Sequence, residues 1–264
     1  MASSEQASGK LEGKVAIITG AGRGVGRSAA LAYARQGARV VVASRTPAQI
    51  EAIAEEIRAL GAAALAVRAD VSRGDDVRNL VERTVAEFGT VDILVNNAAV
   101  ITPGGPTWEI DPEEWMQSIN VNLGGCIRTC RAVLPLMIPR RRGKIINVSS
   151  GAGERTMLNW SMYCASKAAI THLTRVIADE VKPYGVNVNA VGVYAVTQLW
   201  WDQINAGPAG GPHPVNLKKL IDEGRIARPE ENDAVMVFLA SSESDRVTGA
   251  YLGANSIPEA FIER

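Results

Sequence analysis

Short apolar runs alternate with amphipathic stretches along most of the chain. Six runs are rich in valine, isoleucine and other apolar residues, at positions 14–19, 38–43, 63–69, 91–96, 143–149 and 185–191. In most of them the apolar residues follow one another and do not alternate with polar residues. This is typical of strands in a parallel sheet that is covered on both faces, so we expect each run to be a buried strand.

The segments between these runs have the periodicity of helices with one apolar face. They predict helices over 24–36, 47–60, 73–88, 112–138 and 161–182. Strands that alternate with helices in this way require right-handed crossovers between parallel strands. The pattern therefore predicts an α/β fold with a doubly wound parallel sheet. Since neither a repeat nor an interdomain linker interrupts it, we expect a single domain over residues 13–264.

Two segments do not follow the pattern. Residues 1–12 begin with small and polar residues and lack the basic region and apolar core of a secretory signal, so we expect a flexible tail. Residues 198–215 are rich in glycine and proline but contain Trp200 and Trp201. A long irregular segment in a compact domain is often functional, and the tryptophans favour a lid near 198–225 that covers a binding site.

Charge and cysteine content narrow the class of protein. Lys+Arg and Asp+Glu both number 28 in the 264 residues, so the formal net charge is zero and gives no support for a nucleic-acid or membrane-surface role. No apolar run approaches the roughly 20 residues of a membrane span. The three cysteines match neither a disulfide framework nor a metal site. We expect a cytoplasmic protein without a metal, nucleic-acid or membrane partner.

A glycine-rich loop, TGAGRGVG at 19–26, directly follows the first predicted strand and leads into the first helix. In a doubly wound sheet, the N–H groups at this helix start bind the pyrophosphate of a dinucleotide. The spacing departs from G-x-G-x-x-G, since valine stands at position 25. A glycine-rich turn without a ligand stays open as the alternative. The candidate contacts are Thr19, Gly20, Arg23, Gly24, Val25 and Gly26.

The end of the second predicted strand indicates which dinucleotide would bind. NAD sites carry an acidic residue there, whereas this strand ends in Ser44 and Arg45. A guanidinium group offers a planar set of donors that suits the 2′-phosphate of NADP. Arg23 could reach the same phosphate from the glycine loop. Either arginine alone could be an ordinary surface charge, but together they predict NADP(H) rather than NAD(H).

The stretch SMYCASK places Tyr163 and Lys167 four residues apart on the predicted helix 161–182, on the same helical face. The spacing alone is as consistent with a solvated face as with chemistry. A free tyrosine has a pKa of about 10, too high for a base near neutral pH. An ammonium at roughly 6 Å contributes about 3 kcal/mol at an effective dielectric constant near 20. We therefore expect Lys167 to lower the pKa of Tyr163 and make it a general acid/base.

Several motifs occur in a fixed order: TGAGRGVG at 19–26, ADV at 69–71, NNAA at 96–99, VNL at 121–123, NVSS at 147–150 and YCASK at 163–167. With these motifs the chain resembles the short-chain dehydrogenase/reductase family, in its single-domain, NADP-preferring branch. The resemblance implies a Rossmann fold and an oxidoreductase that interconverts a ketone and a secondary alcohol by hydride transfer. It also implies a homotetramer, a dimer of dimers that pairs through helices 112–138 and 161–182. A catalytically silent dinucleotide-binding sensor or scaffold is the alternative.

The resemblance also assigns roles to individual residues. It implies a catalytic tetrad of Asn122, Ser150, Tyr163 and Lys167, with Tyr163 as the general acid/base. Ser150 is preferred to Ser149 because it lies thirteen residues before Tyr163. Ser150 would hold the substrate oxygen, and Asn122 would anchor a water next to Lys167. The implied cofactor contacts are Asp70, Val71, Asn97, Ala98 and Thr197.

Two segments depart from the family motifs. The chain reads NAVGVYAVT at 189–197, with Val193 and Tyr194 where the family has proline and glycine. Tyr194 could pack over a substrate or fill space left by the altered turn. The C-terminal segment TGAYLGANSI, residues 248–257, lacks the family's acidic-glycine ending. Both changes affect the region where the family chooses its substrate and pairs its subunits.

Overall fold

The structure is a computed structural model that describes residues 9–193, 195, 219, 223 and 227–253. Apart from positions 219 and 223, the predicted lid over 198–225 lies outside the described residues. Tyr194 and Thr197 lie outside them as well.

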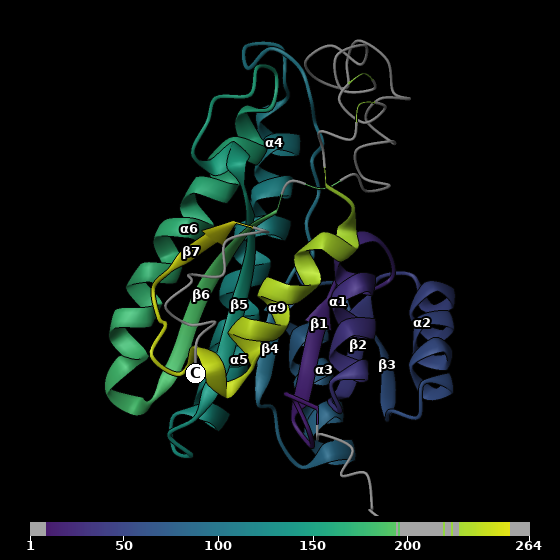
Figure 1. The fold of residues 1–264 in the computed structure, drawn as a ribbon. Coiled ribbons are helices and arrows are strands. Elements are labelled where there is room, and N and C mark those ends of the chain that lie inside the picture. Colours follow the sequence, from purple (N-terminus) through teal and green to yellow (C-terminus); the bar gives the residue numbers. More distant parts are fainter. Residues whose placement is uncertain (1–8, 194, 196–218, 220–222, 224–226, 254–264) are drawn as a thin grey trace, which may run out of the picture.

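Seven parallel strands form one sheet in the order β3-β2-β1-β4-β5-β6-β7 (Figure 1). The strands are β1 Val15–Thr19, β2 Arg39–Ser44, β3 Ala64–Arg68, β4 Ile93–Asn96, β5 Gly143–Ser150, β6 Val186–Val193 and β7 Tyr251–Gly253. The first six coincide with the predicted apolar runs. This order confirms the predicted doubly wound fold. The order of the strands reverses between β1 and β4, since β2 and β3 lie on one side of β1 and β4 to β7 lie on the other.

Helices cover both faces of the sheet. They are α1 Gly24–Arg35, α2 Pro47–Ala59, α3 Gly74–Phe88, α4 Pro112–Ile119, α5 Gly125–Met137, α6 Ser161–Val181 and α9 Asp233–Ala240. One apolar core joins the sheet to α1, α2 and α9, and a second joins it to α3, α5 and α6. Neighbouring residues of β1 belong to different cores, Ile17 to the second and Ile18 to the first. Two covered faces explain why most of these strands show no alternation of apolar and polar residues.

The predicted helix over 112–138 contains a feature that its periodicity did not indicate. It begins as expected: the Asp111 carboxylate accepts a hydrogen bond from the Glu113 N–H at 2.7 Å, and Pro112 occupies the first turn. A single π-helical turn, Asn120–Gly124, then separates α4 from α5. Such turns insert one extra residue and are frequent at functional sites.

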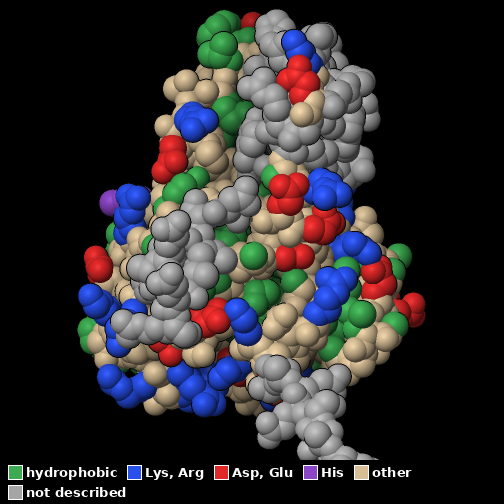
Figure 2. All heavy atoms as spheres, viewed as in Figure 1, with side chains coloured by type: hydrophobic (Ala, Val, Ile, Leu, Met, Phe, Trp, Pro, Cys, Tyr) green, Lys and Arg blue, Asp and Glu red, His purple; other side chains and the backbone are tan. Residues whose placement is uncertain are grey.

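The flexible tail predicted over 1–12 extends too far. Leu11 is fully buried in the first core, and its N–H donates to the Gln36 carbonyl at 2.9 Å. Residues 9–12 therefore belong to the packed structure, because burial of one leucine orders the neighbouring backbone. Of the described helices, none has both the length and the apolar character to cross a membrane. Figure 2 shows basic and acidic side chains interspersed over one face, in keeping with the balanced charge.

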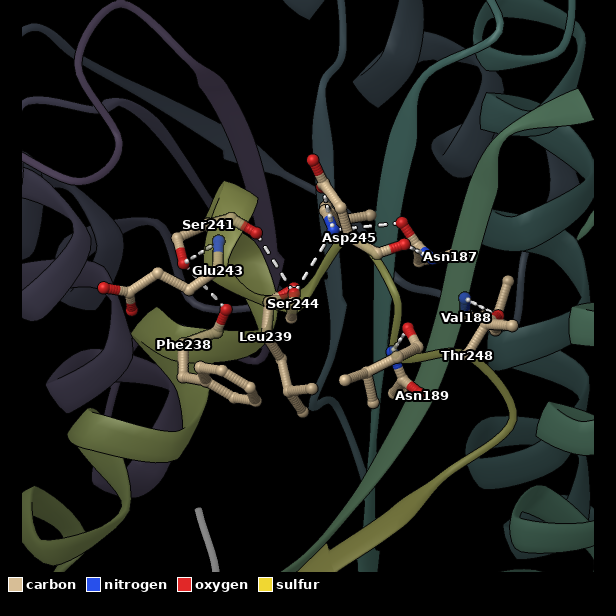
Figure 3. A network of polar contacts seen from close by, with 12 residues as sticks. Asn187, Val188, Asn189, Phe238, Leu239, Ser241, Glu243, Ser244, Asp245 and Thr248 are labelled. Atoms are coloured by element: carbon tan, nitrogen blue, oxygen red, sulfur yellow. Dashed lines mark hydrogen bonds and ion pairs between the residues drawn. The ribbon is translucent and has the colours of Figure 1, made fainter. Parts of the chain in front are cut away.

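A polar network holds the segment that leads from α9 into β7. The buried Lys144 ammonium of β5 donates to Asn187 Oδ1 at 3.0 Å and Ser244 Oγ at 3.2 Å, and pairs with Asp245 at 2.7 Å. The Asn189 amide donates to the Val247 carbonyl at 2.9 Å (Figure 3). These contacts lie toward the amino ends of β5 and β6. They fix the chain so that β7 adds to the sheet beside β6.

Candidate active site

The carboxyl ends of the central strands open into a cavity of about 340 Å³. It lies where the strand order reverses, which is where open α/β sheets bind their ligands. Twelve of the predicted site residues line it: Gly20, Arg23, Gly24, Val25, Ser44, Arg45, Asp70, Val71, Asn97, Ala98, Tyr163 and Lys167. One continuous space therefore connects the glycine loop with the tyrosine and lysine of α6.

The glycine loop packs closely on the end of β4. Gly20 and Gly24 have positive φ angles of 65° and 57°, a conformation that favours glycine. A Cβ on Gly20 would lie 2.8 Å from the Ala98 Cα, and one on Gly26 would lie 2.5 Å from the Asn97 amide nitrogen. That amide donates to the carbonyls of Thr19 and Gly20 at 3.0 and 3.1 Å.

This loop fits the pyrophosphate of a dinucleotide. The first N–H groups of a helix have no partner within the helix, and they attract anions. Gly24 and Val25 form the start of α1 and also line the cavity. The glycines let the backbone border the cavity directly, without side chains in between.

The end of the cavity at β2 is lined by basic and polar side chains. Arg45 and Ser44 lie there with Thr46 and Gln49 of the α2 start, and Arg23 lines the same cavity from the glycine loop. Thr46 and Gln49 were not among the predicted contacts. No local pattern in the sequence places these two side chains at the cavity, because their position depends on how the start of α2 packs beside the glycine loop.

Asp70 lines the same cavity, and its side chain is ionised. Burial opposes its ionisation, but hydrogen bonds from the Ser72 hydroxyl and N–H, at 2.7 and 2.9 Å, outweigh that effect. The charges of Arg45 and Arg73 act in the same direction, so the pKa of Asp70 is lowered. Asp70 therefore remains ionised at neutral pH and lies within electrostatic range of Arg45.

At the other end, α6 brings Tyr163 and Lys167 into the cavity from a buried face of the helix. Tyr163 is 8% exposed and Lys167 is 3% exposed. The Lys167 ammonium donates to the Val148 carbonyl at 2.7 Å and lies 5.5 Å from the centre of the Tyr163 ring. Trp160 packs edge-on against that ring, with 6.2 Å between ring centres. The pair is thus enclosed and does not lie on a solvated face.

The structure brings Ser150, and not Ser149, to the tyrosine. Ser150 hydrogen-bonds to Tyr163 and also accepts from the Ala152 N–H at 3.2 Å. Ser149 points to the other face of the sheet, where its hydroxyl donates to the Lys167 carbonyl at 3.1 Å. Ser149 also lines the cavity, but adjacent residues of a strand face opposite sides, which explains why the two hydroxyls have different partners.

The expectation that the pKa of Tyr163 lies below its ordinary value is wrong. Burial raises the pKa of Tyr163 to about 12, against the opposing effect of the Ser150 hydrogen bond. Burial also lowers the pKa of Lys167 to about 8. The expectation considered the nearby ammonium but not burial, which is the largest influence on the pKa of either group. At neutral pH the phenol therefore keeps its proton.

Asn122 lies in the π-helical turn, behind the wall of the main cavity. Its side-chain oxygen accepts from the Val100 N–H at 2.8 Å, and its amide donates to the Val100 carbonyl at 2.9 Å and to Ser166 at 3.1 Å. A second cavity of about 10 Å³, lined by Asn122, Lys167 and Cys126 among others, separates it from the lysine. That volume is close to what one water molecule needs.

Within the described part of the chain, no group of three or more histidine, cysteine, aspartate or glutamate side chains could hold a metal ion. Cys126 is buried and lines this small cavity with Lys167, a position that the sequence did not indicate. A helix pattern alone carries no signal for that contact, because it depends on how α5 packs against α6.

The chain is similar to known proteins in sequence and in fold. The model of the family described as short chain dehydrogenase matches residues 14–206. The chain is 38% identical over 245 residues to galactitol 2-dehydrogenase of Agrobacterium fabrum, covering 90% of this chain and 94% of that protein. It is 34% identical over 246 residues to a 3-oxoacyl-acyl-carrier-protein reductase of Thermotoga maritima, covering 92% and 97%.

A solved structure with a similar fold is that of NAD⁺-bound xylitol dehydrogenase. Its TM-score is 0.86 at 27% identity, covering 92% of this chain and 98% of that one.

Proposed function

The chain belongs to the short chain dehydrogenase family, and from this premise we propose that it is an NADP(H)-dependent oxidoreductase that interconverts a ketone and a secondary alcohol. One observation carries the proposal: a single cavity runs from the glycine loop to Tyr163 and Lys167. When bound, the nicotinamide would supply or accept a hydride at the substrate carbon. The protein's own residues would bind, orient and protonate the substrate.

Tyr163 is proposed as the proton donor to the carbonyl oxygen. Its raised pKa keeps the phenol protonated, which suits carbonyl reduction more than alcohol oxidation. Ser150, hydrogen-bonded to the phenol, would hold the substrate oxygen where negative charge develops. Lys167 would favour that charge with its ammonium, and Asn122 would contact a water in the cavity between it and Lys167.

The proposed preference for NADP(H) rests on the end of the cavity at β2. Arg45 stands where NAD-binding members of doubly wound folds carry an acid, and Ser44 and Arg23 line the same cavity. An Arg–phosphate contact is charge-assisted and can be bidentate. NAD(H) is the alternative, since the similar xylitol dehydrogenase was solved with NAD⁺ bound.

The relatives suggest where to look for a substrate. Galactitol 2-dehydrogenase and xylitol dehydrogenase are named for polyols, so a polyol or its ketose is our first proposal for the substrate class. We further propose a cytoplasmic homotetramer. Apolar side chains that are half exposed on α5 and α6, Ile127 at 45% and Val176 at 42%, support subunit contact through these helices.

A turnover assay tests the proposed function. Purified protein is supplied with NADPH or NADH and a panel of ketoses and simple ketones, and with the oxidised cofactors and the matching polyols. We expect turnover with at least one pair, and a higher kcat/KM for NADPH than for NADH. Tight cofactor binding without turnover on any member of the panel would instead support the sensor or scaffold alternative.

The reduction rate should depend on pH through Lys167. We expect kcat for carbonyl reduction to fall as the pH rises through about 8, because the Lys167 ammonium loses its proton there. Tyr163 contributes no descending limb in this range, since its pKa is about 12. Initial rates at saturating substrate and cofactor, from about pH 6 to about pH 10, give the profile. A rate that stays constant or increases through this range would exclude the proposed role of the lysine charge.

A further inference from the structure

The π-helical turn Asn120–Gly124 is held on its buried side by Asn122. The Asn122 side chain accepts from the Val100 N–H at 2.8 Å and donates to the Val100 carbonyl at 2.9 Å and to Ser166 Oγ at 3.1 Å. These bonds join the turn to the segment after β4 and to α6. Its exposed side, where Asn120 lies, is bound by a different side chain.

That side chain is Arg128, near the start of α5. Its Nη1 donates to the Asn120 carbonyl at 3.2 Å, and its Nη2 donates to Asn120 Oδ1 at 2.5 Å. Nη1 also donates to the Val71 carbonyl at 3.5 Å, a longer and weaker bond. One guanidinium group therefore connects the first residue of the π turn with the segment that follows β3.

Two glycines make room for this arrangement. Residues 120, 124 and 128 are spaced by four, and residues with this spacing lie on one face of a helix. A Cβ on Gly124 would lie 2.7 Å from Arg128 Nη1 and 2.8 Å from Asn120 Oδ1. A Cβ on Gly125 would lie 2.6 Å from Val71 Cγ2. Gly124 thus lets the arginine side chain reach back over the turn, and Gly125 lets α5 approach Val71.

The π turn depends on such contacts because it is not the regular conformation of a helix. It contains one residue more than the α-helical turn that it replaces. Each residue of an α-helix turns the chain by about 100°, so conversion to regular helix would rotate Asn122 relative to α5 and away from its partners. The bonds from Arg128 run across the turn, from α5 back to Asn120, and therefore oppose this conversion.

We propose that Arg128 is a positioning residue: by binding Asn120 across Gly124, its guanidinium group holds the π turn in the form that places Asn122 at the small cavity beside Lys167. The inference rests on the proposed function, in which Asn122 contacts a water in that cavity. Arg128 itself lines neither this cavity nor the main one, so it acts through Asn122. A displacement of about 1 Å at a catalytic group can lower a rate about 100-fold.

Three variants change the contact in different ways. Arg128→Ala removes the guanidinium group, Arg128→Lys keeps the charge but not the planar set of donors, and Gly124→Ala places a methyl group in the path of the side chain. Arg131→Ala, at an exposed arginine of the same helix, is the matched control. Arg128→Ala is also combined with Asn122→Ala. Rates are expressed per cofactor-binding site, and crystal structures give the distances from Asn122 to Val100 and Ser166.

We expect Arg128→Ala and Gly124→Ala each to lower kcat about 10-fold to 100-fold, with little change in cofactor Kd. Gly124→Ala should do so without lowering the melting temperature, because alanine is a better helix former than glycine. Arg128→Lys should retain more activity than Arg128→Ala, since an ammonium can still bind one Asn120 oxygen. Arg131→Ala should equal the wild type. In the Asn122→Ala background, Arg128→Ala should cause no further loss, because the residue that it positions is already absent.

Equal losses of kcat from Arg128→Ala in both backgrounds would overturn the proposal, because the arginine would then act other than through Asn122. Unchanged kcat per site in Arg128→Ala, with only a lower melting temperature, weaker cofactor binding or altered assembly, would overturn it as well. Should Asn122→Ala fail to fold, the crystal structure of Arg128→Ala decides: a retained π turn with Asn122 still bonded to Val100 and Ser166 contradicts the proposal.

The same experiments separate this inference from the proposed function. If the wild-type protein turns over a substrate and Arg128→Ala equals it, the positioning role alone fails. If the wild type shows no turnover with any substrate, the proposed function fails. The crystal structures of the wild type and of Arg128→Ala then still decide whether the arginine holds the π turn.

Discussion

Replacing Tyr163 by phenylalanine is expected to lower kcat for carbonyl reduction by about 1,000-fold, because it removes the proposed proton donor and leaves its surroundings intact. The phenylalanine ring keeps the edge-on contact with Trp160, so folding should be preserved. The cofactor should bind with nearly unchanged Kd, because the glycine loop and the β2 end of the cavity are untouched. Steady-state rates together with a fluorescence titration of NADPH measure both quantities.

Tyr184→Phe provides the control for this variant. Tyr184 is 43% exposed and lies after α6, so the same loss of a hydroxyl there should leave kcat unchanged. If Tyr163→Phe keeps more than about a tenth of wild-type kcat, the proton donor is another group, and the role proposed for Tyr163 fails.

Replacing Arg45 by aspartate should reverse the preference between the two cofactors. A charge-assisted hydrogen bond is worth about 1.5–3 kcal/mol, and a factor of ten in affinity corresponds to about 1.4 kcal/mol. Loss of the guanidinium and repulsion from the new carboxylate should therefore weaken NADPH binding by about 100-fold. NADH lacks the 2′-phosphate and should bind as well as before, or better. The ratio of the two Kd values, from titration, measures the change.

Arg78→Asp is the control for charge alone. It makes the same change on α3, at an arginine that pairs with Asp75 and does not line the cavity. The ratio of Kd values should equal that of the wild type in this variant. An unchanged ratio in Arg45→Asp would mean that the end of β2 does not choose the cofactor.

The strands and the fold class could be predicted because a strand that is buried on both faces has apolar residues at most of its positions. β1 is buried along its whole length, and its sequence VAIIT is nearly all apolar. The same logic failed for α9, where apolar residues such as Val235, Met236 and Phe238 follow one another and give no clear helical period. β7 was missed because three residues beside glycines are too short for any pattern.

The candidate site was predictable where its chemistry follows local spacing. Tyr163 and Lys167 share a helical face, and the glycine loop lies between a strand and a helix, so both could be read from neighbouring residues. The pKa of Tyr163 could not, because it depends on how much water α6 and its neighbours exclude. The bonds from Arg128 to Asn120 could not be predicted either, because they depend on the π turn, which the periodicity over 112–138 does not indicate.

Hydride transfer is the central claim, and isotope transfer tests it most directly. The wild-type protein is given NADPH that carries deuterium at the transferable position of the nicotinamide, together with a ketose or ketone that it reduces. Mass spectrometry of the alcohol product should find one deuterium, bound to the former carbonyl carbon. A product without deuterium, or no alcohol product with any ketone of the panel, would contradict the account.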